Sequence, residues 1–143
     1  MFFKTFEFEF ETRRLMWYCP YGGSDFAEVQ STTEKITENN YESWYIEWYK
    51  LGSKLTEKNF NSSISKGKAY LRASRYLQAA EFFLSPKDSR KLDCYQLSID
   101  YFYKGLHLLS IPYELKEVPF EDYSLRTLFF KTNQTPKGTL LIC

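Results

Sequence analysis

The chain has 143 residues and a mass of 17.1 kDa. Its residues are 43% hydrophobic and 26% charged, which is typical of one globular domain. Aromatic residues make up 20%, and the low counts of 6 Gly and 5 Pro exclude low-complexity and collagen-like chains. A net charge of +1 gives no general attraction to nucleic acid or to an anionic membrane, and no apolar run reaches the roughly 20 residues that cross a bilayer. We therefore expect a cytoplasmic protein with neither nucleic acid nor membrane as a partner.

The first 40 residues carry a mixed pattern. Phenylalanines alternate with glutamates from Phe6 to Phe10, which is the period of a strand, but Phe3, Phe6 and Phe10 also share one helical face. The sequence therefore leaves both a strand and a helix possible for the opening segment. A glycine-rich turn then precedes a short helix that Asp25 or the serine before it caps, and this helix ends near Ile36.

Three longer helices are predicted next, each with one apolar stripe at spacings of three and four residues. The first begins at Tyr41, the second begins at Ser62 or Ser63 and stops before Pro86, and the third is capped by Asp88. The stripe of the first helix is Trp44, Trp48, Leu51 and Leu55. That of the second is Ala69, Ala73, Tyr76, Ala80 and Phe83, and that of the third is Leu92, Tyr95, Ile99, Phe102, Leu106 and Leu109. Gly105 in the third helix predicts a close crossing with a neighbouring helix.

Strands are predicted after Leu109, because prolines interrupt the segments 111–113 and 118–120 and residues 125–131 are apolar and aromatic. Residues 139–143 form an unbroken apolar run of the kind that occupies a buried central strand. Helices followed by strands indicate an α+β fold, with a helical domain over 1–110 and strands over 111–143. Because a central strand needs neighbours on both sides, we expect the chain to be part of a larger sheet.

Sites for metals or cofactors are not expected. Cys19, Cys94 and Cys143 lie far apart without C-x-x-C spacing, and their odd number leaves at least one thiol unpaired. A zinc site needs about four ligands, and the chain has one histidine. We expect reduced thiols, no metal site and no cofactor.

The motifs of common enzymes are also missing. There is no G-x-S-x-G, P-loop, H-E-x-x-H or dinucleotide fingerprint. His107 lies between two leucines on an apolar helix, which favours a packing residue over a general base. The carboxylates that cluster near the predicted strand turn are more typical of an exposed turn than of an acid and base pair. They are Glu114, Glu117, Glu121 and Asp122.

Two further groups have alternative interpretations. The basic residues of the middle segment could bind phosphate, but such a row is usually a solvated helix exterior. They are Lys66, Lys68, Arg72 and Arg75, interleaved with Tyr70 and Tyr76. The aromatic residues could form the walls of an apolar pocket, but core packing explains most of them. They are Trp44, Tyr45, Trp48, Tyr49, Tyr76, Phe82 and Phe83. Because neighbours on a helix point about 100° apart, Tyr45 and Tyr49 must cover a second surface.

Several stretches together resemble the N-terminal region of a branch of the α/β-hydrolases that includes pseudooxynicotine hydrolases and esterases of the fermentation-respiration switch type. The stretches are Tyr21-Gly22-Gly23-x-Asp25 with Glu28-Val29, Ser43-Trp44 with Trp48, Y-L-R-A-S-x-Y at 70–76, A-E-F-F-L at 80–84, Asp88-x-Arg90 and V-P-F-E at 118–121 with Leu125. Asp122 stands where this family favours glycine, and Arg126-Thr127 replace a Pro-Gly turn. The run 139–142 is similar to the strand that precedes the oxyanion-hole glycines.

This resemblance implies a helical cap-type region followed by the first strands of a hydrolase sheet, in a lineage that cleaves ester or carbon–carbon bonds of small molecules. The family's nucleophilic serine, acidic residue and histidine all come later than the matched region, so we assign no catalytic, cofactor-binding or metal-binding residue and expect no catalysis by this chain alone. A small-molecule substrate in the full-length relatives and a homodimer surface on the helices are further expectations. The alternative is a protein-interaction module similar to tetratricopeptide repeats, although such an array needs about three repeats.

Overall fold

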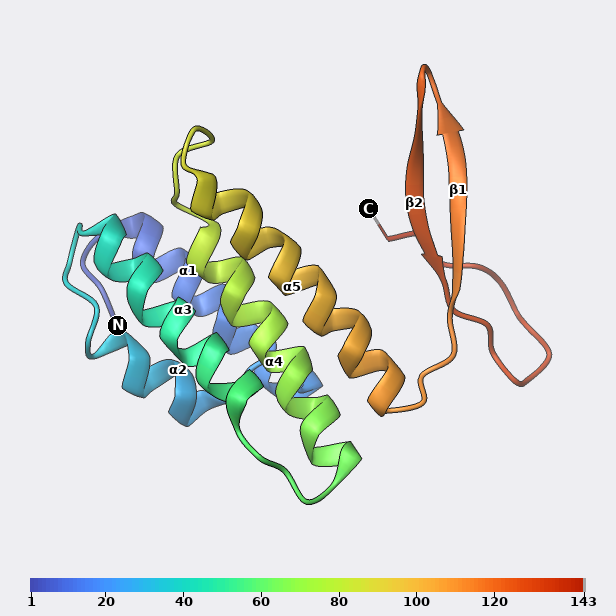
Figure 1. The fold of residues 1–143 in the computed structure, drawn as a ribbon, viewed down its shortest axis with the longest axis horizontal. Coiled ribbons are helices and arrows are strands. Elements are labelled where there is room, and N and C mark those ends of the chain that lie inside the picture. The colour runs from blue at the N-terminus through green and yellow to red at the C-terminus, as the bar shows by residue number, and fades with distance from the viewer. Residues whose placement is uncertain (143) are drawn as a thin grey trace. The chain divides into compact units, whose positions relative to one another are not determined.

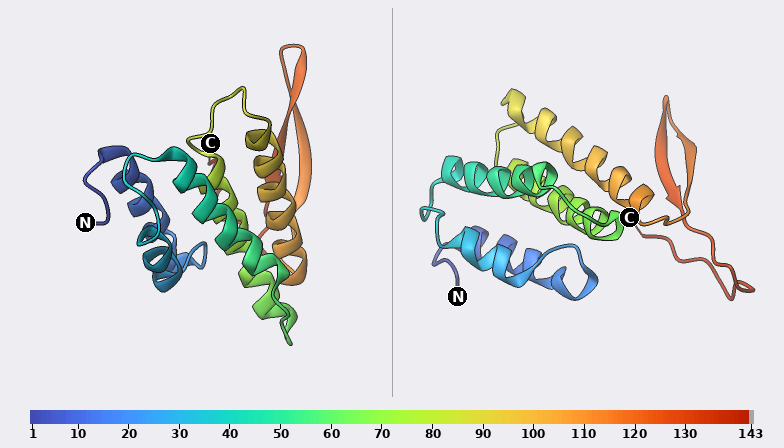
Figure 2. Two further views of the ribbon diagram at one scale, coloured as in Figure 1. Left: turned by 60° about the vertical axis from the view of Figure 1, so that its left-hand side comes forward. Right: turned by 60° about the horizontal axis from the view of Figure 1, so that its bottom comes forward.

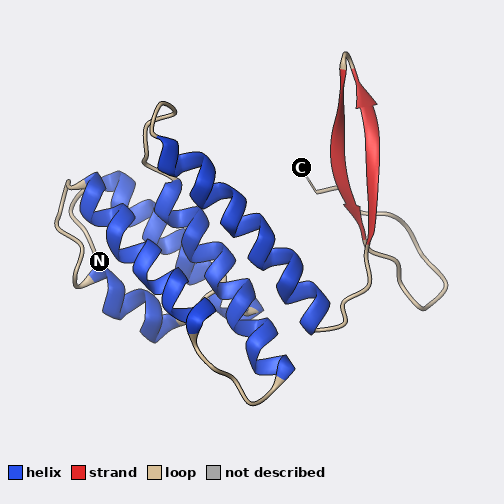
Figure 3. Ribbon diagram, in the orientation of Figure 1, coloured by secondary structure: helices blue, strands red, loops and turns tan. Residues whose placement is uncertain are grey.

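The computed structural model describes residues 1–142. The chain forms two compact units, one over Met1–Leu109 and a second that begins at Ser110. The first unit is helical, and the second contains a two-stranded antiparallel sheet (Figure 1, Figure 3). Helices followed by strands confirm the α+β fold class.

Five helices form the first unit: α1 (Phe6–Trp17), α2 (Phe26–Thr33), α3 (Tyr41–Glu57), α4 (Ser63–Glu81) and α5 (Ser89–Leu108), with a short 3₁₀ turn, η1 (Cys19–Tyr21), after α1. The four helices α2 to α5 begin after a side chain that accepts a backbone N–H of the first turn, namely Asp25, Asn40, Ser62 and Asp88. These caps lie where the sequence predicts helix starts. The helix α4 lies between α3 and α5 (Figure 2).

The opening segment is a helix, so the strand alternative for it is wrong. The carboxylate of Glu9 accepts the backbone N–H groups of Phe2 and Phe3 at 2.7 and 3.0 Å, and it also pairs with Arg13 one turn later at 2.8 Å. These bonds satisfy donors of the chain before the helix and support α1 from within. Its buried face also differs from the predicted one, because Phe8 is fully buried while Phe6 is 75% exposed.

The core of the helical unit is aromatic. Trp44 and Trp48 of α3 are both fully buried, as predicted, and Trp44 packs against Phe8 of α1 with ring centres 4.7 Å apart. The indole N–H of Trp44 donates to the carbonyl of Ala79 in α4 at 2.8 Å. Phe83, predicted on the α4 stripe, lies beyond the end of that helix and packs on Trp44 at 5.1 Å. One ring therefore joins three segments of the chain.

The buried face of α5 differs from the predicted stripe in the first half of the helix, whereas Leu106 near its end is buried as predicted. Leu92 and Tyr95 are 70% and 46% exposed, whereas Cys94 and Ser98 are buried. α4 and α5 approach closely in both halves of α5: the thiol of Cys94 lies 3.1 Å from the backbone carbonyl of Leu77, and an added Cβ at Gly105 would lie 2.7 Å from the Leu71 side chain of α4. Helices that approach this closely meet through small side chains, so the larger apolar ones are left on the outer face.

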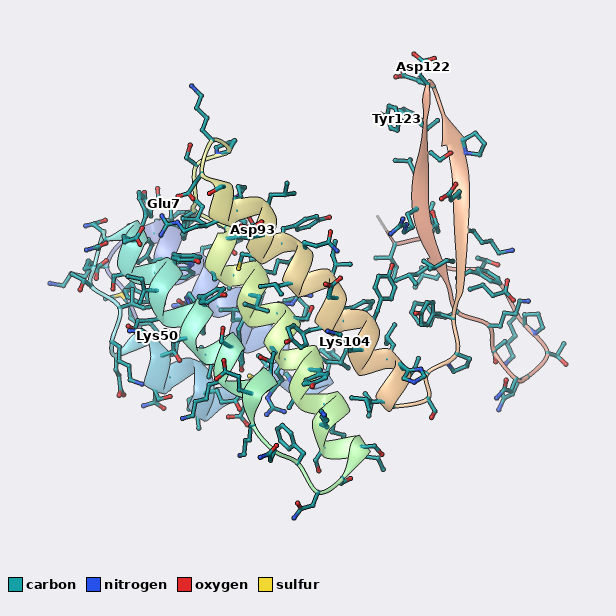
Figure 4. The ribbon with its side chains drawn as sticks, in the orientation of Figure 1. Glu7, Lys50, Asp93, Lys104, Asp122 and Tyr123 are labelled. Carbon is teal, nitrogen blue, oxygen red and sulfur yellow. The ribbon has the colours of Figure 1, made fainter. Side chains whose placement is uncertain are left out.

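The second unit is a hairpin of β1 (Glu114–Phe120) and β2 (Tyr123–Phe129), in which Phe120 pairs with Tyr123. The two-residue turn between them carries Glu121 at φ 49°, a left-handed conformation at the first turn position. Asp122 lies at the tip (Figure 4). The expected strand at 111–113 is not formed, and β1 begins at Glu114 instead.

The buried strand expected at 139–143 is not formed over the described part, 139–142. Leu140, Leu141 and Ile142 are 82%, 78% and 83% exposed, and Cys143 lies outside the described residues. A strand requires a neighbour for its backbone N–H and C=O groups, and in residues 1–142 the strand pairing is that of β1 with β2.

Two of the three cysteines are described, and both are free thiols. Cys19 is partly exposed, while Cys94 is buried and donates its S–H to the carbonyl of Leu77 at 3.1 Å. Burial raises the pKa of the Cys94 thiol to about 12, which keeps it protonated and makes it a packing residue of the α4/α5 contact.

Candidate functional site

The residues considered for acid–base chemistry lie apart from one another or are paired with cations. His107 is an exposed residue in the last turn of α5. In the hairpin, the carboxylate of Glu114 pairs with Lys131 and with Lys116, and these cations lower its pKa below the usual range. Glu121 and Asp122 form the hairpin turn. A paired carboxylate on an exposed strand is a poor proton acceptor, so the surroundings of Glu114 are those of an exposed strand residue rather than of a general base.

The aromatic rows serve mainly as core. Trp48 and Tyr76 are fully buried and their rings stack with centres 5.7 Å apart, which joins α3 to α4. Tyr45 and Tyr49 are partly buried beside this core, and their rings contact each other with centres 5.5 Å apart and planes tilted by 30°. The guanidinium of Arg90 lies 4.6 Å from the ring centre of Tyr45.

Three residues of the hydrolase-like stretches meet in one polar network between α2 and α4. The carboxylate of Glu28 accepts two hydrogen bonds from the guanidinium of Arg72, at 2.8 and 3.0 Å, and a third from the hydroxyl of Tyr76 at 2.8 Å. The same hydroxyl accepts the backbone N–H of Asp25, the residue that caps α2, at 2.8 Å. This network fixes the start of α2 against the middle of α4.

The network determines the charge states of its members. Burial raises the pKa of Tyr76 far above its ordinary value, and the negative charge of Glu28 raises it further, so the hydroxyl stays protonated. Burial alone would lower the pKa of Arg72, but the hydrogen bonds and charge of Glu28 outweigh this effect and raise it. Because the guanidinium of Arg72 already donates to Glu28, it is less available to a phosphate, which weighs against the phosphate-binding alternative.

A second network of the same kind joins α5 to α3. Arg90 contacts the carboxylates of Asp88 and Glu42, each at 2.7 Å. Asp88 also caps α5 through the backbone N–H of Arg90 at 3.0 Å. The Asp88-x-Arg90 stretch thus connects the start of α5 to the start of α3.

Replacing Glu28 with Gln is expected to lower the free energy of unfolding by about 1–2 kcal/mol, because the half-buried Arg72 loses its charged partner. The matched control is Glu47→Gln, which removes the carboxylate partner of the exposed Lys50 and is expected to cost less than about 0.5 kcal/mol. Urea denaturation of both variants measures the difference. Equal losses would show that the Glu28 network contributes no more than a surface pair.

A cleft of about 220 Å³ lies between α1 and α4. Its lining combines charged, aromatic and aliphatic side chains: Glu11, Arg14, Leu15 and Tyr18 from α1 and the residue after it, and Arg75, Gln78, Ala79, Glu81 and Phe82 from α4 and its end. The sequence pointed to Arg75 and Phe82 but not to Arg14 or Gln78. No local pattern links the two helices, since residues 60 positions apart meet here by tertiary packing alone.

Comparison with curated proteins finds relatives that carry hydrolase names. The hydrolase LUC6 of a Fusarium species is 36% identical over 121 residues, which cover 80% of this chain and 29% of the relative. The α/β-hydrolase psoB of Aspergillus fumigatus is 35% identical over 128 residues, covering 78% and 29%. The 20-hydroxy-prefusarin hydrolase FUS2 of Gibberella moniliformis is 33% identical over 121 residues, covering 80% and 29%. These similarities support an α/β-hydrolase family for this chain.

These three relatives are much longer proteins, and the chain spans less than a third of their length. No family model matches the chain. Among residues 1–142, no three His, Cys, Asp or Glu side chains gather as metal ligands would. No helix in the same described range combines the length and the hydropathy needed to cross a bilayer.

Proposed function

We propose that this chain is the N-terminal part of a serine α/β-hydrolase, with a cap-like helical region at 1–110 and the first strands of the hydrolase core at 111–143. The observation that carries the proposal is the 33–36% identity to named hydrolases over about four-fifths of the chain. The helical unit followed by an antiparallel hairpin supports it, because that order agrees with the resemblance noted above.

The roles that we propose for the helices and for the rest of the enzyme follow from the residues present. A serine hydrolase needs a nucleophile, a histidine base and backbone N–H groups that stabilise the oxyanion. These 143 residues contain a single histidine and no G-x-S-x-G. The helices would therefore cover the substrate and exclude water, while catalysis would belong to other parts of the full-length enzyme.

The proposed reaction is hydrolysis of an ester bond or a carbon–carbon bond in a small organic molecule. The name of one relative specifies 20-hydroxy-prefusarin, which supports a small organic substrate. The branch that includes pseudooxynicotine hydrolases and esterases of the fermentation-respiration switch type is the finer assignment that we propose. The homodimer surface stays a prediction.

The purified chain is expected to hydrolyse p-nitrophenyl acetate no faster than an equal mass of its His107→Ala variant. The physical reason is that His107 is exposed in the last turn of α5, in a chain without an elbow serine for it to activate. Initial rates followed by absorbance of p-nitrophenolate provide the measurement. A rate that exceeds the variant's would show that this chain carries a catalytic base.

Sequencing the source DNA beyond the codon for Cys143 tests the hydrolase assignment itself. An open frame that continues through paired glycines to a G-x-S-x-G would support it. A stop codon directly after Cys143 would contradict the proposal that the chain is part of an active hydrolase.

A further inference from the structure

The charges around the α1/α4 cleft do not cancel. Glu11 is held by Arg14 at 2.9 Å, and Glu81 is held by Lys91 of α5. Arg75, in contrast, has no carboxylate within 4 Å among residues 1–142 and donates instead to the side-chain carbonyl of Gln78. The lining therefore retains one positive charge that this part of the chain does not neutralise.

The geometry of Arg75 leaves the edge of its guanidinium available. Its guanidinium lies over the ring of Tyr18, with the central carbon 4.0 Å from the ring centre. The N–H groups of a guanidinium lie in its plane, so stacking covers the face and leaves N–H donors at the rim. A planar, two-oxygen acceptor matches this arrangement better than a single carbonyl does.

A second guanidinium lines the same cleft. Arg14 lies 5.9 Å from the ring centre of Phe82 and is 39% exposed at its side chain. Burial lowers the pKa of Arg75 below its ordinary value, and the positive charge of Arg14 adds to this effect while Tyr18 opposes it. Because Glu11 already pairs with Arg14, Arg75 is the guanidinium of this lining that has no carboxylate partner among residues 1–142.

The remaining lining residues and the volume of the cleft limit the size and polarity of the ligand. Leu15 and Ala79 supply aliphatic surface, while Tyr18 and Phe82 supply rings. A volume of about 220 Å³ is below the range of about 300–1,000 Å³ that drug-sized ligands occupy. The cleft thus suits a compact molecule with one negative end and one apolar end.

We propose that the α1/α4 cleft binds a small apolar monocarboxylate, whose two oxygens accept hydrogen bonds from Arg75 and whose apolar body packs on Leu15 and Ala79. This site is independent of the hydrolase assignment, because it is built within the helical unit and needs no catalytic residue.

Nuclear magnetic resonance titration of the labelled wild-type chain tests the site directly, with sodium benzoate as the probe at constant ionic strength. Benzoate is expected to shift the methyl signals of Leu15 and Ala79 and the Nε–H signal of Arg75, with a dissociation constant of about 1 mM. Benzamide has the same shape without the charge and is expected to leave them unchanged. Inorganic phosphate, which has charge without an apolar body, is expected to leave the two methyl signals unchanged.

The variant Arg75→Gln is expected to weaken benzoate binding at least about tenfold, because it removes the charged fork. The matched control is Arg13→Gln, one residue from Arg14 on the same helix, since Arg13 pairs with Glu9 and does not line the cleft. Equal shifts with benzamide, methyl signals that move with phosphate, or an unchanged affinity in Arg75→Gln would each overturn the proposal. The methyl measurement on the wild-type chain decides the question even if the variant fails to fold.

Discussion

Replacing Trp44 with Ala is expected to lower the free energy of unfolding by about 4 kcal/mol. The side chain is fully buried, and its ring lies 4.7 Å from that of Phe8 and 5.1 Å from that of Phe83. The substitution leaves a cavity where α1, α3 and the turn after α4 meet. It also leaves the carbonyl of Ala79 without the indole N–H that donates to it.

The matched control for this experiment is Trp17→Ala. Trp17 is also an indole of the helical unit, but it is 62% exposed, and its loss is expected to cost less than about 1 kcal/mol. Urea denaturation followed by far-ultraviolet circular dichroism is the suitable measurement, because fluorescence would change with the number of tryptophans. Similar losses in the two variants would contradict the central position of Trp44 in the core.

The second large effect is expected for Gly105→Val, at about 3 kcal/mol of lost unfolding free energy. A Cβ at this position would lie 2.7 Å from the side chain of Leu71 and 3.2 Å from the backbone carbonyl oxygen of Gly67. The leucine can change its rotamer, but the carbonyl belongs to the α4 backbone and cannot move away alone. The two helices must therefore separate, and the packing around Cys94 and Leu77 loosens with them.

Two comparisons separate this clash from the general effect of valine in a helix. Lys104→Val changes the neighbouring exposed residue of α5, shown in Figure 4, and is expected to cost less than about 1 kcal/mol. Gly105→Ala is expected to cost less than Gly105→Val, because the gain in helix propensity of about 1 kcal/mol offsets part of the contact. Thermal or urea denaturation ranks the three variants. A Gly105→Val variant as stable as Lys104→Val would rule out the close crossing.

The sequence predicts helices well where large apolar residues make the contact. The apolar spacing predicted the start of α3 at Tyr41 and most of its buried face: Trp44, Trp48 and Leu55 are buried, while Leu51 is partly buried. The same reasoning failed for the first half of α5, where Leu92 and Tyr95 are exposed. Periodicity assumes that the largest apolar side chains face the neighbour, and this assumption fails where two backbones approach closely.

Polar sites are harder to predict than helices. Glu28, Arg72 and Tyr76 could be singled out through a family resemblance, but nothing in their spacing shows that they bond to one another. The sequence groups Arg72 with Arg75 as part of a basic face. In the fold, Arg72 pairs with the carboxylate of Glu28, whereas Arg75 lies over the ring of Tyr18. Two residues three positions apart on a helix share a side, but their partners depend on the helices that pack there.

The sequence by itself determined the local elements of this protein. Capping side chains, proline positions and the three- and four-residue spacing of apolar side chains act within a few residues, so they set where the helices begin and that strands follow. Only the tertiary structure decided which faces of α1 and α5 are buried, and that Arg14 and Arg75 line one cleft. These features arise from contacts between residues far apart in the chain, whose energies no local pattern encodes.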